Sequence, residues 1–122
     1  MTYISCQALR DLSVSTLAQN FASIWVEKYP HLDLETEVKF VPHRRFRADF
    51  GFVPNIVFIK GKAVATAPGI LIECDGGVHS IKFQKDNEKE AIALQLGFQY
   101  FRLTEETLEL KLDVIAEAIK NL

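Results

Sequence analysis

The most constraining feature of the chain is the segment ILIECDGGVH, which begins at Ile70. Its apolar first residues lead directly into two acids and two glycines. Its first residues are long and apolar, which favours a buried strand. Side chains alternate between the two faces of a strand, so Glu73 and Asp75 share one side. Ile70, Ile72 and Cys74 share the other side. The sequence therefore predicts two carboxylates side by side at the end of a buried strand.

Two carboxylates at this distance repel each other unless a proton or a cation lies between them. A divalent cation is the natural occupant, because hard cations prefer oxygen ligands. Gly76 and Gly77 end the strand and allow the backbone to turn close to a bound group. His79 follows that turn. This stretch is therefore the first candidate for a metal-dependent site.

A second acidic strand is predicted within residues 44–52, where apolar and polar residues alternate. One face consists of Phe46, Ala48, Phe50 and Phe52, and the other consists of Arg45, Arg47, Asp49 and Gly51. An acid flanked by large apolar residues costs free energy unless it is paired or bound to metal. Asp49 is therefore either a third carboxylate of the site or the partner of Arg45 or Arg47 in an exposed ion pair.

The remaining elements follow from periodicity and from helix- and strand-breaking residues. Helices are expected over residues 13–29, over residues 82–96 and from residue 104 onward, and further strands over residues 35–41 and 98–103. A hairpin-like excursion with a tight turn is expected between residues 55 and 69. The chain is thus expected to form one mixed α/β (α+β) domain over residues 1–122, with a central mixed sheet flanked by helices.

Two helical stripes add detail to this prediction. The buried stripe of the final helix is expected to be Leu108, Leu112, Ile115, Ile119 and Leu122. One stripe of the helix over residues 82–96 carries Asp86, Lys89, Ala93 and Leu96. The polar end of that stripe is expected near the loop after Gly77, close to Glu73 and Asp75.

Composition limits the class of protein. The 122 residues are 48% hydrophobic and 25% charged, which is ordinary for a globular domain. No apolar run approaches the roughly 20 residues of a membrane span, and the N-terminus does not look like a signal peptide. Cys6 and Cys74 are too few for a disulfide framework, which fits a reducing cytoplasm. Both cysteines are expected to serve as small apolar residues that fill the core. The net charge of −2 does not indicate nucleic-acid binding, although metal-holding acids lower the net charge of a phosphate-binding protein.

The order of these elements and acids resembles the PD-(D/E)XK nuclease superfamily, which has the restriction-endonuclease-like fold. The nearer likeness is to the very-short-patch-repair-like branch and its small phage endonucleases, over about residues 36–104. The matching residues are Arg45, Arg47, Asp49 and Phe50; Glu73, Asp75, Gly76 and Gly77; Asp86 and Lys89; and Leu96, Gly97, Phe98 and Arg102. Glu37 also falls where many of these proteins carry an acid or an amide.

Departures from the family pattern lie around the expected cleft. Ala48 stands where the superfamily motif has proline, and Asp75 stands where it has lysine. An acid at the position of Asp75 is usual within this branch. Lys89 on the next helix then takes over the role of the motif lysine. The loop over residues 77–86 is shorter than in many relatives and the excursion over residues 55–69 is longer, so substrate preference does not carry over.

The resemblance implies metal-assisted hydrolysis of a phosphodiester bond. Asp49 and Glu73 would hold Mg²⁺ or Mn²⁺, with the Cys74 carbonyl as a further oxygen ligand. Asp75 would be another metal ligand or would position the attacking water. Lys89 would stabilise negative charge in the transition state.

Other residues would support this chemistry. Asp86 would orient Lys89 through a pair one helical turn apart. His79 would act as acid or base, because imidazole titrates near neutrality, or would only form a local hydrogen bond. Phosphate contacts with DNA would come from His43, Arg44, Arg45, Arg47, Lys60 and Lys62. The two lysines lie in the expected hairpin turn, where they equally well serve solubility alone.

The function expected from this resemblance is a Mg²⁺-dependent DNA endonuclease in the cytoplasm. It would act on branched or mismatched DNA in repair, recombination or phage DNA processing, and it would have no membrane partner. A homodimer is expected, because such small nucleases often cut two strands as a pair. One alternative is a non-catalytic nucleic-acid-binding module that keeps the fold. Another is a structural protein whose acids form surface ion pairs. The presence of Asp49, Glu73 and a nearby lysine together favours the enzyme.

Overall fold

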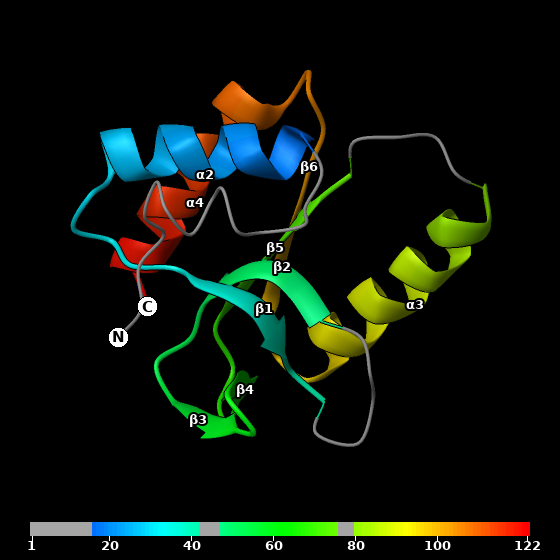
Figure 1. Cartoon of the computed structure of the whole chain (residues 1–122). Helices are drawn as coiled ribbons and strands as arrows, with labels where there is room; N and C mark the ends of the chain where they lie inside the picture. The colour runs from blue at the N-terminus through cyan, green and yellow to red at the C-terminus, as the bar shows by residue number, and fades with distance from the viewer. Residues whose placement is uncertain (1–15, 42–46, 76–79) are drawn as a thin grey trace.

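The computed structural model describes the backbone of residues 16–41, 47–75 and 80–122, and the side chains at 16, 62–63 and 80–86 lie outside the description. The described part of the chain contains three helices and a six-stranded mixed sheet (Figure 1). The helices are α2 (Thr16–Lys28), α3 (Ser80–Gln95) and α4 (Leu108–Lys120). The strands are β1 (Glu35–Lys39), β2 (Arg47–Phe52), β3 (Ile56–Ile59), β4 (Lys62–Ala65), β5 (Ile70–Cys74) and β6 (Gln99–Leu103).

The sheet places the two acid-bearing strands side by side. Its order is β3-β4-β1-β2-β5-β6. Strand β2 runs antiparallel to both of its neighbours, β1 and β5, whereas β5 and β6 are parallel. Parallel neighbours need a crossover connection, and α3 provides it. The predicted sites on β2 and β5 therefore lie next to each other within the sheet.

Helices cover both faces of the sheet (Figure 1). Helices α2 and α4 share one face, where their apolar residues pack with Phe50, Ile70 and Ile72. Helix α3 covers the opposite face, where Ala93 packs in one cluster with Leu71. Since consecutive strand residues point to opposite faces, β5 contributes to both cores and is buried along its whole length.

Aromatic rings fix α2 on the sheet. The ring centroids of Phe21 and Trp25 on α2 lie 5.7 Å apart, and Phe21 lies 5.1 Å from Phe50 on β2. The indole Nε1 of the buried Trp25 donates a hydrogen bond of 2.8 Å to the Leu32 carbonyl. A buried Trp needs such a partner for its polar atom. These contacts tie α2, and the loop that follows it, to the central strands.

The predicted elements have counterparts among the described residues, and the expected mixed α/β class is confirmed. The excursion between residues 55 and 69 is the antiparallel hairpin β3–β4. The final helix begins at Leu108 instead of residue 104. The preceding turn holds a local hydrogen bond of 2.9 Å from the Thr104 amide to the Thr107 hydroxyl, and such bonds compete with helix.

The predicted stripe of the final helix extends one residue too far. Leu108, Leu112, Ile115 and Ile119 are buried, but Leu122 is 53% exposed, and its predicted burial was wrong. Leu122 lies two residues past the last helical residue, Lys120, so the helix no longer directs its side chain toward the core. The two apolar residues of the predicted α3 stripe also differ in burial. Ala93 is buried, whereas Leu96, just past the helix, is 48% exposed.

The predicted faces of β2 hold for its phenylalanines but not for Ala48. Phe50 and Phe52 pack in the cluster beneath α2 and α4, whereas Ala48 belongs to the cluster beneath α3. The cross-strand neighbour of Ala48 on β1 is Val38, which follows Glu37, a residue with a φ of 50°. A residue in the left-handed region interrupts the regular pleat of a strand. The simple alternation rule therefore fails at this point of the β1–β2 pair.

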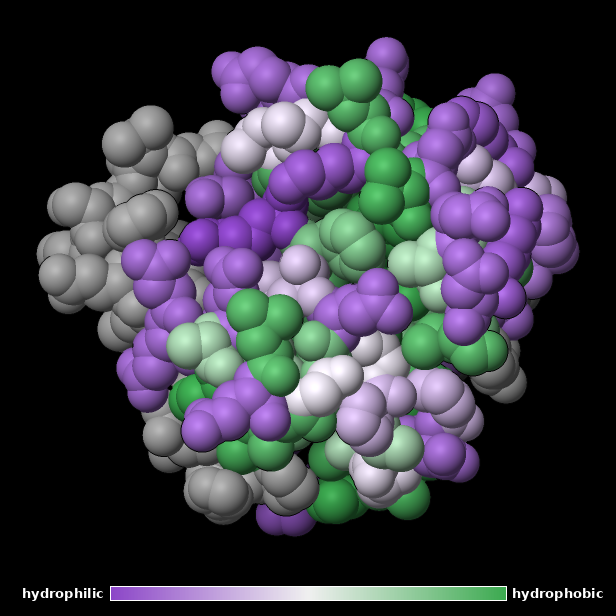
Figure 2. Space-filling view, turned by 180° about the vertical axis from the view of Figure 1, so that it is seen from behind, coloured by the Kyte–Doolittle hydropathy of each residue, from purple (hydrophilic) through white to green (hydrophobic). Residues whose placement is uncertain are grey.

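The surface mixes polar and apolar side chains. Figure 2 views the molecule from behind and shows hydrophilic and hydrophobic residues next to each other over this face. Large exposed apolar residues include Phe58 and Ile59 on β3 and Leu110 on α4. Within residues 16–41, 47–75 and 80–122, no helix combines the length and the apolar character that crossing a membrane requires.

The close approach of two segments at Gly69 gives a first prediction. A Cβ atom on Gly69 would lie 2.5 Å from the Phe52 carbonyl oxygen and 2.8 Å from the Val53 Cα. Because backbone atoms cannot easily move aside, Gly69→Ala should lower the free energy of unfolding by about 1–3 kcal/mol. Gly61→Ala is the matched control, since its Cβ would meet nothing within 4 Å and only its φ of 77° opposes the change. Urea unfolding should show the larger loss for Gly69→Ala, and the reverse ranking would contradict this packing.

Candidate active site

The ladder between β2 and β5 ends where the acids begin. Its last backbone pair is Phe50–Ile72, so Asp49 and Glu73 stand at the next position of the same register. At this position, side-chain carboxylates replace backbone carbonyls as the acceptors for the strand amides. The Asp49 amide donates to the Glu73 Oε1 over 3.2 Å, and the Cys74 amide donates to the Asp49 Oδ2 over 2.9 Å. The two carboxylates thus cross between the strands and satisfy amides beyond the ladder.

Lys89 brings the opposite charge to this junction from α3. Its Nζ donates over 2.9 Å to the Glu73 Oε1 and over 2.8 Å to the Arg47 carbonyl. Both side chains of the ion pair are largely buried, with 13% of Lys89 and 10% of Glu73 exposed. Helix α3 packs on the face of the sheet to which Glu73 points, which explains why this lysine meets that acid. Screening by water is weak at such burial, so the pair is strongly coupled.

A second set of contacts fixes α3 beside the site. Arg102 on β6 is the register partner of Glu73. Its Nη1 donates over 3.1 Å to the Asn87 Oδ1 and lies 3.4 Å from the Glu90 Oε1. Asn87 and Glu90 lie on either side of Lys89 in the α3 sequence. Arg102 therefore holds the helical turn from which Lys89 reaches Glu73.

Arg47 stands next to the carboxylates with an unused donor. Its carbonyl accepts the hydrogen bond from Lys89, and its side chain is half-buried. Among the described residues, the buried Nε of Arg47 has no hydrogen-bond partner. A buried guanidinium N–H without an acceptor costs free energy, and an anionic group is the partner that suits it best.

The thiol of Cys74 is not suited to nucleophilic chemistry. Burial raises the pKa of Cys74 well above its ordinary value, and the nearby charges of Asp49 and Glu73 raise it further. Only a thiolate is an effective nucleophile or metal ligand. The side chain packs instead with Ile70 and Ile72 in the core beneath α2 and α4. The expected face of Ile70, Ile72 and Cys74, and the expected role of Cys74 as apolar filler, agree with this packing. Cys6, the other expected filler, lies outside the described residues.

Asp75 lies one residue past β5 and is half-buried. Its amide donates over 2.8 Å to the Leu103 carbonyl, so pairing with β6 continues past the end of β5. Over the described ranges, no three or more His, Cys, Asp or Glu side chains are grouped so that they could hold a metal ion. The structure thus brings Asp49 and Glu73 together, and the roles of Asp75 and of the Cys74 carbonyl as ligands stay predictions.

Several predicted site residues lie outside the described part of the chain. These are Gly76, Gly77 and His79 after β5, and His43, Arg44 and Arg45 before β2. Phe46, a residue of the predicted apolar face, lies outside it as well. The side chains of Lys62 and Asp86 also lie outside it. Lys60 and Glu37 are described and exposed. Lys60 lies in the β3–β4 turn with a φ of 53°, and two strands separate its hairpin strand from β2.

The contacts of Arg102 with Asn87 and Glu90 were missed from the sequence. The alternation of β6 correctly placed Arg102 on the face opposite Leu103, since Leu103 packs beneath α2 and α4. The alternation did not predict the strand register that places Arg102 beside Glu73. Register between parallel strands depends on how the connecting helix packs, and local periodicity does not determine it.

Comparisons of the chain with protein-family models, with curated proteins and with solved structures found no match. The interpretation of the site therefore depends on its own geometry. That geometry consists of two carboxylates from neighbouring strands, a lysine from the covering helix and an arginine that holds this helix in place.

The buried ion pair gives a second prediction. Lys89→Met keeps an apolar stem but leaves the Glu73 carboxylate without its ammonium partner, which should lower the free energy of unfolding by about 3–5 kcal/mol. Adding Glu73→Gln should recover part of this loss, because no uncompensated charge then remains. Urea unfolding of both single variants and the double variant measures the coupling. Strictly additive losses would contradict the ion pair.

Proposed function

We propose that the chain is a metal-dependent DNA endonuclease with a restriction-endonuclease-like core. The observation that carries this proposal is the meeting of Asp49, Glu73 and Lys89, from β2, β5 and α3, where the β2–β5 ladder ends. The order of elements, with α3 between β5 and β6, agrees with the order that the family resemblance implies. Residue types and topology therefore support the same reaction class.

The donor set suits a hard divalent cation. Asp49 and Glu73 would hold Mg²⁺ or Mn²⁺, because carboxylate oxygens are the ligands that these ions prefer. The Cys74 carbonyl and Asp75, at the same end of β5, are the proposed further ligands. A bound cation supplies polarisation of the scissile phosphate and a water of lowered pKa.

The other residues would bind and orient the phosphate. Lys89 holds a positive charge beside Glu73, where it would stabilise negative charge that develops during hydrolysis. Arg102 would act as a positioning residue through its contacts with α3. The buried Nε of Arg47 would donate to a phosphate oxygen, and His43, Arg44 and Arg45 would contact neighbouring phosphates of DNA without reading sequence. His79 would serve as acid or base.

One observation supports a structural alternative. The Glu73 Oε1 already accepts hydrogen bonds from the Asp49 amide and from Lys89, as expected of an internal ion pair. In that case the acids would only hold β2, β5 and α3 together, and the chain would be a non-catalytic module. The two readings differ in one measurable respect, since only the first makes the carboxylates necessary for metal binding and cleavage.

Cleavage assays on duplex, single-stranded and branched DNA, with Mg²⁺ or Mn²⁺, test the proposal. Glu73→Gln should abolish cleavage, and Lys89→Met should lower its rate by about 10²–10³-fold. Lys111→Met is the matched control, because Lys111 on α4 also donates to a strand carbonyl, that of Arg102, over 2.7 Å. It should keep its activity. Cleavage that persists undiminished in Glu73→Gln, or no cleavage of any substrate by the wild type, would contradict the proposal.

Metal binding is tested independently by thermal unfolding. A ligand that binds only the folded state raises the unfolding midpoint, so Mg²⁺ or Mn²⁺ should raise the Tm of the wild type. Asp49→Asn should remove this increase. Asp113→Asn should keep it, because Asp113 is an exposed acid on α4 that pairs with Lys28. Equal increases in both variants, or none in the wild type, would favour the structural alternative.

A further inference from the structure

The outer edge of β3 is an exposed apolar surface in a different part of the sheet from the acids. Strand β3 is one of the two edge strands of the described sheet, and β4 and β1 separate it from β2. Its residues Val57, Phe58 and Ile59 are 45%, 57% and 53% exposed. Single apolar residues on a surface are ordinary, but consecutive ones on an edge strand form a template for pairing with another strand.

The hairpin shows which backbone groups of β3 face this edge. The Thr66 amide donates over 2.9 Å to the Asn55 carbonyl. In an antiparallel pair, every second residue directs its N–H and C=O to the same neighbour. Asn55, Val57 and Ile59 therefore direct these groups toward β4. Ile56 and Phe58 direct theirs toward the outer edge.

We propose that β3 pairs antiparallel with β3 of a second copy of this chain, so that two sheets join into one. Pairing of a strand with itself needs a register in which outward-directed residues oppose each other. A register that sets Ile56 opposite Phe58 of the second copy meets this requirement. The two-fold axis then passes between the two copies of Val57, and the same pair recurs on each side of it. The contact is self-complementary, as an isologous dimer requires, and it covers the exposed apolar residues of both copies.

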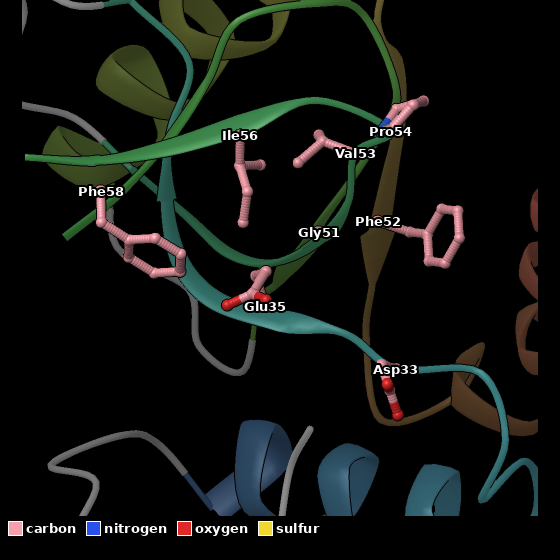
Figure 3. Close-up of a pocket in the computed structure, with 8 residues that line it drawn as sticks. All are labelled: Asp33, Glu35, Gly51, Phe52, Val53, Pro54, Ile56 and Phe58. Carbon is pink, nitrogen blue, oxygen red and sulfur yellow. The ribbon is translucent and has the colours of Figure 1, made fainter. Parts of the chain in front are cut away.

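Charge complementarity favours a second copy over an unrelated strand. A pocket of about 230 Å³ lies beside β3, and its lining includes Asp33, Glu35, Pro54, Ile56 and Phe58. Figure 3 shows the Ile56 side chain directed across this pocket toward Glu35 on β1. The same register brings the β3–β4 turn of the second copy, with Lys60, to the Pro54 end of β3, and Pro54 lines the same pocket as the two acids. Each copy thus offers an exposed lysine to the other copy's pocket, whose lining includes Asp33 and Glu35.

A disulfide across the two-fold axis tests the register. In a Cys6→Ser background, Val57→Cys would place two thiols on a non-hydrogen-bonded pair, with Cα atoms about 4.5 Å apart, which a disulfide accepts. Ile59→Cys is the matched control, because its two copies would lie about 13 Å apart along the strands. Mild oxidation should give a covalent dimer, reversible by dithiothreitol, for Val57→Cys only. Equal cross-linking of both variants, or none, would overturn the proposal.

Sedimentation velocity tests the association itself, independently of any nuclease activity. The wild type should form a dimer whose fraction rises with concentration. Val57→Lys should weaken the dimer by at least about tenfold, because like charges then meet at the axis, while circular dichroism confirms that the variant is folded. Leu110→Lys should not weaken it, since Leu110 is 76% exposed on α4. A wild type that stays monomeric at every concentration leaves the edge to a strand of another protein and overturns the proposal.

Discussion

The crossed hydrogen bonds between β2 and β5 are the constraint on which the site depends. The carboxylate of each strand accepts from an amide of the other strand, so neither strand can shift without losing a hydrogen-bond partner. Lys89 then neutralises Glu73 and fastens α3 to the same junction. An unpaired acid at this burial would cost several kcal/mol. The same contacts that hold the sheet and helix together therefore also set the spacing of the candidate catalytic groups.

The position of the acids followed from the sequence, but their partners did not. Alternation along β5 correctly separated Glu73 from Ile70, Ile72 and Cys74, which pack in the opposite core. The helical stripe correctly placed Lys89 near Glu73. The bonds from Lys89 to the Arg47 carbonyl and from Arg102 to α3 depend on register and helix packing, which arise only when distant segments meet.

The two proposals concern opposite kinds of surface on one sheet. At the β2–β5 junction, buried charges are satisfied by one another and by backbone amides. At β3, apolar side chains and outward-directed backbone groups lie open at the edge. If both proposals hold, the two-fold axis at β3 relates two copies of the β2–β5 site on one joined sheet. A pair of sites related in this way suits an enzyme that cuts two strands of DNA.

The most direct measurement of the central claim is a crystal structure of the chain grown with Mn²⁺, with anomalous data collected to locate the ion. The account predicts an anomalous peak at the β2–β5 junction, with oxygens of both Asp49 and Glu73 about 2.0–2.4 Å away, as carboxylates bind hard divalent cations. It also predicts that Lys89 has changed its contact with Glu73. No peak at this junction, with Lys89 still bonded to Glu73, would contradict the account and leave the acids with a structural role.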